Sequence, residues 1–148
     1  MPQLDLTVQG RGRFAGLPAR TTLARWIGSV LERDAEIVLR FVDAREGRRL
    51  NREFRGKDYP TDVLTFAYAQ APVVRADIVI CPSVAWRGAR ERRTAPRAHL
   101  AHLIVHGVLH GHGFEHDAVK AAHAMEAREI AVLTALGFDD PYAAPGRA

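Results

Sequence analysis

The chain has 148 residues, with 21 Lys and Arg against 17 Asp and Glu. This length suits one domain with its own core, and no apolar run approaches the roughly 18 residues that cross a membrane. The lone cysteine, Cys81, excludes an internal disulfide and indicates a reducing compartment. The start has no basic stretch followed by an apolar one, as a secretory signal requires. We therefore expect a single cytoplasmic domain over residues 1–148, with no membrane partner.

The charge is unevenly distributed along the chain. Residues 1–97 hold 18 of the 21 basic and 11 of the 17 acidic residues, a net +7. The remainder is net −3 and contains all seven histidines. The basic residues are almost all arginine, whose planar guanidinium suits phosphate. Most of them are typical of a solvated surface, but the asymmetry keeps a polyanion such as nucleic acid among the candidate partners.

The spacing of apolar residues predicts alternating strands and helices. Asp43 suits a helix N-cap and Gly56 the end of that helix, while Pro96 suits the first turn of a long helix. This order predicts an α+β fold in which helices cover a small mixed four-stranded sheet. The predicted elements are strands at 4–8, 36–42, 63–68 and 77–81, and helices at 18–33, from Asp43 to about Phe54, just after Pro82, from Pro96 to 111–113, and at 118–136, with a basic, exposed stretch at 86–93.

The strongest chemical pattern is the segment HGVLHGHGFEH at residues 106–116. His106 and His110 share one face of the long helix, about 5–6 Å apart at Cβ, so both can reach one metal ion. Gly113 can turn the chain back and bring in His116 as a third ligand. Three protein nitrogens leave one position open, which is typical of a catalytic zinc site. One Zn²⁺ per chain is the expectation, and nickel, copper or cobalt also accept such ligands.

The other four histidines are not expected to bind the metal directly. His99 and His102 continue the same helix face, but they lie one to two turns from the pair, so we expect a supporting or packing role. His112 points away from this face and His123 lies on the next helix, and neither is assigned a role. The zinc-protease motif places glutamate directly after its first histidine, where this chain has Gly107. This difference disfavours peptide hydrolysis.

The histidine segment, with its pattern HGxLHxxGFxH, resembles the signature of the YbeY family, bacterial single-strand endoribonucleases that mature ribosomal RNA. The resemblance covers about residues 48–142 and includes the Leu-Asn start, the Arg-Gly-Lys-Asp core and the Pro-Thr-Asp-Val-Leu end of segment 50–66, the strand at 77–81, and the tail at 125–142. This chain departs from the family pattern at four positions, none of which removes a ligand. They are Gly111 for leucine, Glu115 for aspartate, Ala76 for glycine and Thr65 for serine.

The resemblance implies a zincin-like metalloprotein that cleaves single-stranded RNA. It implies a role in maturing the 3′ end of small-subunit ribosomal RNA and in ribosome quality control, with the small ribosomal subunit or its proteins as partners. Arg55 matches a family arginine opposite the metal, where positive charge stabilises the phosphodiester transition state. Asp77 either orients a water on the metal or a histidine, or caps its strand. The basic stretch would bind the RNA backbone through Arg87, Arg90, Arg92 and Arg93.

Two other functions stay open at this point. One is an RNA-binding factor in ribosome assembly, in which the metal is structural and cleavage is absent. The other is a zincin-like peptide hydrolase, which Gly107 disfavours.

Overall fold

The structure, a computed structural model, describes residues 1–143, so the last five residues of the predicted 1–148 domain lie outside the described residues. Four strands form one sheet in the order β1-β2-β4-β3. Strands β1, β2 and β4 are parallel, and β3 pairs antiparallel with β4 at one edge. This single α+β domain confirms the predicted fold class. The strands are β1 (Leu4–Gln9), β2 (Ala35–Phe41), β3 (Val63–Ala69) and β4 (Val74–Ile80).

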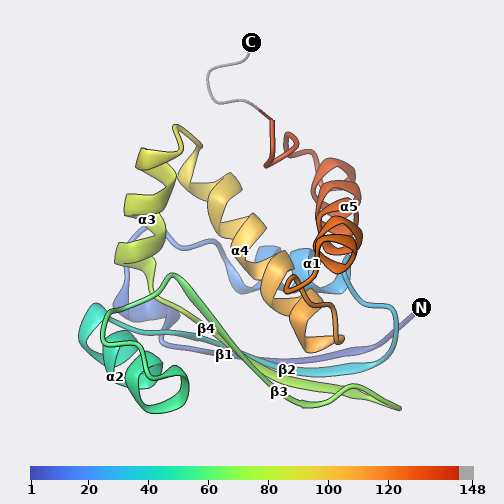
Figure 1. The fold of residues 1–148 in the computed structure, drawn as a ribbon, viewed down its shortest axis with the longest axis horizontal. Helices are drawn as coiled ribbons and strands as arrows, with labels where there is room; N and C mark the ends of the chain where they lie inside the picture. Colours follow the sequence, from blue (N-terminus) through green and yellow to red (C-terminus); the bar gives the residue numbers. More distant parts are fainter. Residues whose placement is uncertain (144–148) are drawn as a thin grey trace.

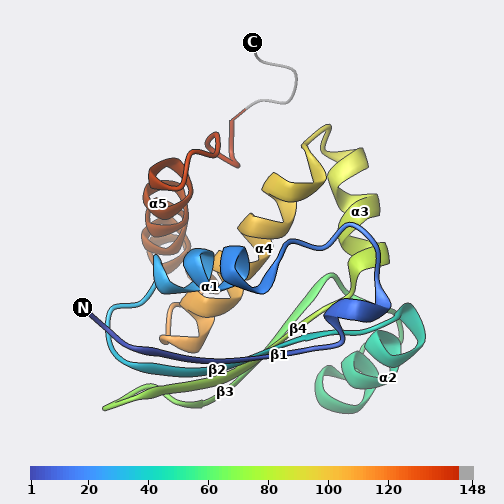
Figure 2. The same cartoon turned by 180° about the vertical axis from the view of Figure 1, so that it is seen from behind.

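Five α-helices and one short 3₁₀ helix surround this sheet. Helices α1, α3, α4 and α5 lie on one side, with α4 crossing the sheet, whereas α2 lies on the other side (Figure 1). The view from behind shows the same division (Figure 2). The helices are η1 (Arg11–Arg13), α1 (Arg20–Gly28), α2 (Ala44–Arg55), α3 (Pro82–Glu91), α4 (Pro96–Gly111) and α5 (Val119–Ala135).

The main core lies between the sheet and the helices of the α4 side. Fully buried Ile37 and Ile78 of the sheet belong to one apolar cluster with Trp26 of α1 and Ile104 of α4. Burial of each such side chain stabilises the fold by about 1.5–3 kcal/mol. A smaller cluster beneath α2 joins the helix to one end of the opposite sheet face through Leu50, Leu64 and Val79, among others. The rest of that face carries mainly polar side chains, such as Thr7 and Glu36, together with Val38.

Local sequence explains where several elements begin and end. The Asp43 carboxylate accepts a hydrogen bond from the Glu46 amide at 2.8 Å, which confirms the predicted N-cap of α2. Gly56 ends that helix in the left-handed region, at φ 69°. The basic stretch at 86–93 is helical up to Glu91, because Ala85 and Ala89 bury one face of α3.

The helix predicted at 18–33 is shorter than expected and ends at Gly28. The amide of Val30 bonds to the Ile27 carbonyl at 3.0 Å in a tighter turn. Val30 is nonetheless fully buried. Its apolar character therefore reflects burial of a loop residue, and periodicity alone extended the predicted helix too far.

No helix among residues 1–143 is long and apolar enough to span a membrane.

Candidate metal centre

Two glycines set how closely α4 approaches the sheet. A Cβ on Gly107 would lie 2.9 Å from Cγ2 of Ile78 and 3.2 Å from Oγ1 of Thr65. A Cβ on Gly111, one turn later, would lie 3.1 Å from Cβ of Ala76. The helix backbone thus rests directly on β3 and β4, and the residue after His106 has no room for the glutamate of a zinc protease. This packing argues against the zincin-like peptide hydrolase, because the position of its general base is closed.

The histidines of α4 and the following turn converge on one point. Nε2 of His110 lies 3.0 Å from Nε2 of His106 and 3.1 Å from Nδ1 of His116. One nitrogen from each of the three rings lies within 4.8 Å of the others, the spacing of a three-ligand metal site. His106 and His110 are half-buried and His116 is exposed, so the cluster is accessible from solvent on the His116 side.

The turn after α4 is what brings the third ring to the first two. Gly113 has φ 101°, a conformation that L side chains rarely adopt, and its amide bonds to the His110 carbonyl at 3.0 Å. The Phe114 amide then bonds to the Leu109 carbonyl at 3.1 Å. The chain therefore reverses within a few residues of the helix end and places His116 against His110, as the spacing predicted.

Hydrogen bonds fix which nitrogen of two rings faces the cluster. The Phe114 carbonyl can only accept a hydrogen bond, so Nδ1 of His110 donates to it at 2.8 Å. In the neutral ring, Nε2 of His110 then has a free lone pair. Nδ1 of His106 lies 3.2 Å from the Glu129 carboxylate. Both rings therefore direct Nε2 inward, and in the neutral imidazoles these nitrogens carry the lone pairs that a divalent transition metal binds. The donor set of the described residues thus fits the expected metal.

The electrostatics of the cluster favour neutral imidazole at His110. Burial lowers the pKa of His110 below its ordinary value, and the neighbouring His106 ring lowers it further. The hydrogen bond to the Phe114 carbonyl acts in the opposite direction, with a smaller effect. The neutral ring is the one that ligates a metal.

Beside the cluster, α5 contributes a buried carboxylate. Glu129 is 1% exposed and accepts hydrogen bonds from Nε2 of His102 at 2.6 Å and from the Tyr142 hydroxyl at 2.8 Å, besides the contact with His106. Burial by itself would raise the pKa of Glu129, but hydrogen bonds from His102, His106 and Tyr142 outweigh it and lower the pKa to about 2. The carboxylate is therefore ionised at neutral pH, and His102 has the supporting role expected of it.

A family profile described as Endoribonuclease YbeY matches residues 19–137. A protein named Endoribonuclease YbeY from Acidovorax sp. (strain JS42) is 55% identical over 149 residues, which cover 96% of this chain and 97% of its own length. Another from Cupriavidus pinatubonensis is 53% identical over 146 residues, 95% of this chain and 73% of that protein. The chain belongs to the YbeY family.

A solution structure of a Thermotoga maritima protein shares the fold. It is 24% identical, has a TM-score of 0.59, and the match covers 97% of this chain and 99% of that one.

Two of the positions where this chain is expected to differ from the YbeY pattern, Gly111 and Ala76, face each other between α4 and β4. A Cβ on Gly111 would lie 3.1 Å from Cβ of Ala76, so glycine at this position allows the close approach of α4 to β4.

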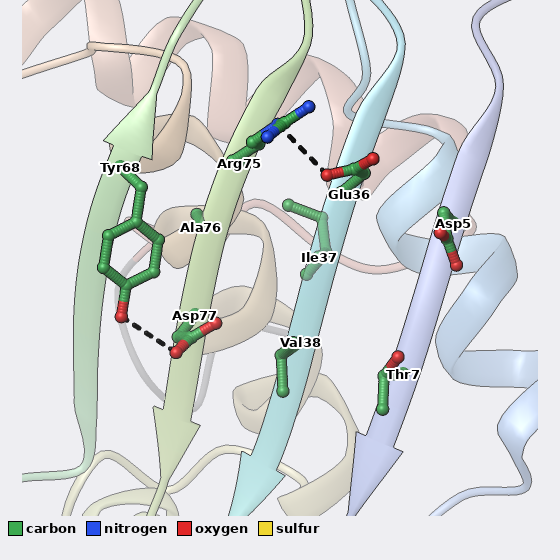
Figure 3. A pocket seen from close by; sticks show the side chains of 9 residues that line it. All are labelled: Asp5, Thr7, Glu36, Ile37, Val38, Tyr68, Arg75, Ala76 and Asp77. Atoms are coloured by element: carbon green, nitrogen blue, oxygen red, sulfur yellow. Dashed lines mark hydrogen bonds and ion pairs between the residues drawn. The ribbon is translucent and has the colours of Figure 1, made fainter.

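Asp77 does not join the histidines. Strand residues alternate between faces, and its neighbours Ala76 and Ile78 point toward α4. The Asp77 carboxylate instead lines a shallow pocket on the opposite face and accepts a hydrogen bond from the Tyr68 hydroxyl at 2.9 Å (Figure 3). This corrects the expectation that Asp77 orients a water on the metal or a histidine, because the sheet itself lies between them.

Arg55 is the last residue of α2 and its side chain is exposed. Arg48 and Arg52 of the same helix both pair with Asp58, whereas Arg55 has no ion pair or side-chain hydrogen bond within residues 1–143. Helix α2 lies on the side of the sheet away from α4 (Figure 1). Arg55 therefore makes no contact with the histidines within residues 1–143. Its role toward a phosphate remains a prediction.

The arginines of the basic stretch lie on α3 and the turn after it. All four are exposed, and their side chains form no ion pair or hydrogen bond in the part of the chain that the structure describes. Arg93 adopts a positive φ of 54° at the turn between α3 and α4. These four guanidinium groups are exposed on α3 and the turn after it, and their binding to an RNA backbone stays a prediction.

The sequence alone assigned no role to Glu129 or Tyr142, which the structure places beside the cluster. The signal for Glu129 was present, because it lies on the same helical face as the buried Met125 and Leu133. A lone carboxylate on an apolar face needs a partner, and here the partners are two histidines. His112 and His123 have no place in the cluster, as expected: the His112 ring bonds to the Val108 carbonyl at 2.8 Å, and His123 is exposed.

Proposed function

We propose that this protein is a metal-dependent endoribonuclease that cleaves single-stranded RNA in the cytoplasm. The observation that carries the proposal is the convergence of His106, His110 and His116 in a chain of the YbeY family. Its relatives bear the name of an endoribonuclease, so the open side of the cluster is the natural place for a phosphodiester.

The three histidines would hold one metal ion, and Zn²⁺ is the ion that three imidazoles suit best. When bound, such an ion supplies a Lewis acid for a phosphoryl oxygen and lowers the pKa of a bound water. The rings of His106 and His110 are already oriented for it by the Glu129 carboxylate and the Phe114 carbonyl. Nickel, copper and cobalt are alternatives that the same nitrogens accept.

The substrate would be held by arginine side chains outside the cluster. Arg87, Arg90, Arg92 and Arg93 are exposed without partners among the described residues, and each can bind a backbone phosphate without reading sequence. Arg55 is equally free to neutralise charge on a phosphodiester. Single-stranded RNA is the expected substrate because its flexible backbone can follow charges on separate elements.

In the cell, the proposed substrate is the precursor of small-subunit ribosomal RNA, cut at its 3′ end, with a further part in ribosome quality control. The small ribosomal subunit or its proteins are the proposed partners. A strain depleted of the protein is expected to accumulate small-subunit RNA with an unprocessed 3′ end. The wild-type chain should restore processing, and the chain with His110→Ala should not.

The direct test combines metal analysis of the purified protein with cleavage of matched single-stranded and duplex RNA. We expect about one zinc per chain and cleavage of the single strand, both lost in His110→Ala. His123→Ala is the matched control, because His123 is an exposed histidine outside the cluster. Cleavage by His110→Ala in the presence of a chelator would overturn the proposal. Metal and RNA binding without any cleavage would instead favour the assembly factor with a structural metal.

A further inference from the structure

The Glu129 carboxylate is a buried charge whose two oxygens serve different partners. Oε2 lies 2.6 Å from Nε2 of His102 and 3.2 Å from Nδ1 of His106. Oε1 accepts the Tyr142 hydroxyl at 2.8 Å. A buried carboxylate is costly unless it is hydrogen-bonded, and here three donors from α4 and the segment after α5 satisfy it. The arrangement therefore places a fixed negative charge directly behind one of the three candidate metal ligands.

We propose that Glu129 is a positioning residue for the metal, acting through His106. An ionised carboxylate can only accept, so His106 carries a proton on Nδ1. The neutral ring then presents the lone pair of Nε2 toward Nε2 of His110. The same bond stops rotation of the imidazole ring. A hydrogen bond to a carboxylate also makes a ligating histidine more basic. Loss of such a partner typically lowers the affinity for the metal by roughly 10–100-fold.

The remaining contacts hold Glu129 itself in place. His102 is buried and engages Oε2 through Nε2, so this ring supports the carboxylate rather than the metal. Tyr142 comes from the segment after α5, and its hydroxyl also lies 3.4 Å from Nε2 of His102. Three separate parts of the chain thus meet at one carboxylate: the first half of α4, the middle of α5 and the turn at 141–143.

This inference rests on the metal-binding part of the proposed function and is independent of RNA cleavage. The first readout is the tautomer of His106 in the wild-type protein, measured from the ¹⁵N chemical shifts of its ring. A protonated Nδ1 and an unprotonated Nε2 are expected. The opposite tautomer would overturn the proposal without any variant.

The second readout is zinc affinity, measured by competition with a chromophoric chelator. Glu129→Gln keeps the shape of the side chain but removes its charge, and we expect zinc to bind about 10–100-fold more weakly. The ring of His106 should then show a mixture of tautomers. Glu126→Gln is the matched control, because Glu126 lies on the same helix and forms no hydrogen bond to a histidine within residues 1–143. Its zinc affinity should stay within about twofold of wild type.

Tyr142→Phe tests the same chain of contacts without altering the carboxylate. Loss of one hydrogen bond to Glu129 should weaken zinc binding about fivefold, with the His106 tautomer unchanged. This variant also covers the case in which Glu129→Gln does not fold. Unchanged zinc affinity in both variants would overturn the proposal, even if wild-type protein cleaves RNA. Failure of wild-type protein to cleave RNA would overturn the proposed function alone, because zinc affinity and tautomer are measured without RNA.

Discussion

The two faces of the sheet are made from the same strands, yet they differ in almost every respect. On one face, Ile37 and Ile78 are buried beneath α1 and α4, and the histidine cluster lies at the end of α4. On the other face, α2 covers only one end, through Leu50. The uncovered part carries Asp77, which bonds to Tyr68, and Arg75, which pairs with Glu36 (Figure 3).

Residues that are adjacent in the sequence can lie on opposite faces of the sheet, one near the histidine cluster and the other far from it. Asp77 and Ile78 are adjacent in sequence, but successive strand side chains point to opposite faces. Ile78 therefore packs against the helix that carries the ligands, while Asp77 bonds to Tyr68 across β3 and β4. The buried face packs against the helix that carries His106 and His110. The polar face makes its own contacts, such as the ion pair of Arg75 with Glu36.

Removal of the metal should have the largest effect and should involve only the α4 face. A ligand that binds only the folded state stabilises it by about 2.7–4.1 kcal/mol at 100–1,000 times its Kd. Chelation of zinc should lower the free energy of unfolding by that amount, measured by urea denaturation with and without free zinc. The same loss is expected in Asp77→Asn. A smaller loss in that variant would show that the polar face contributes to metal binding.

Gly107→Ala should have the next largest effect, because the added Cβ would lie 2.9 Å from the Ile78 side chain. Overpacking of this kind costs roughly 1–3 kcal/mol. The helix must move away from β3 and β4, so zinc affinity should fall together with stability. Gly28→Ala is the control, since Gly28 ends α1 with open space around it. Its stability should be unchanged or slightly higher, and an equal loss in both variants would contradict this account of the α4 contact.

Substitution by alanine of the four arginines on α3 and the turn after it should weaken RNA binding without affecting zinc affinity. Each phosphate contact contributes about 0.7 to the slope of log K against log salt for single strands. The slope should therefore fall by up to about 3 units in the variant lacking Arg87, Arg90, Arg92 and Arg93. Arg75→Ala on the polar face, where Arg75 pairs with Glu36 at 3.1 Å, should leave the slope unchanged. A slope that depends equally on Arg75 would place RNA on that face.

Tyr68→Phe should have the smallest effect of the series. It removes the hydrogen bond to Asp77 on an exposed tyrosine, so stability should change by no more than about 0.5 kcal/mol. Zinc affinity and RNA cleavage should match those of the wild-type protein, as measured by chelator competition and single-strand cleavage. A loss of cleavage of tenfold or more would show that the two faces cooperate in the reaction.

Several helix ends and the convergence of the three histidines could be predicted because they depend on short-range patterns. Asp43 caps α2 through the amide three residues on, and His106 and His110 share a helix face because of its period. Gly113 turns the chain because its φ is positive. The predicted length of the first helix was wrong. Val30 is apolar because it is buried in the turn after α1, and it does not extend the helix.

The amino-acid sequence by itself predicted the α+β class, the ends of most helices and the three histidines that converge. The helix ends and the histidine spacing follow from residues a few positions apart. Only the tertiary structure decided which partners those histidines have. Glu129 meets His106 across 23 residues of chain, and Asp77 is separated from the cluster by the sheet to which it belongs. Such contacts depend on how helices and strands pack, and no local spacing contains that information.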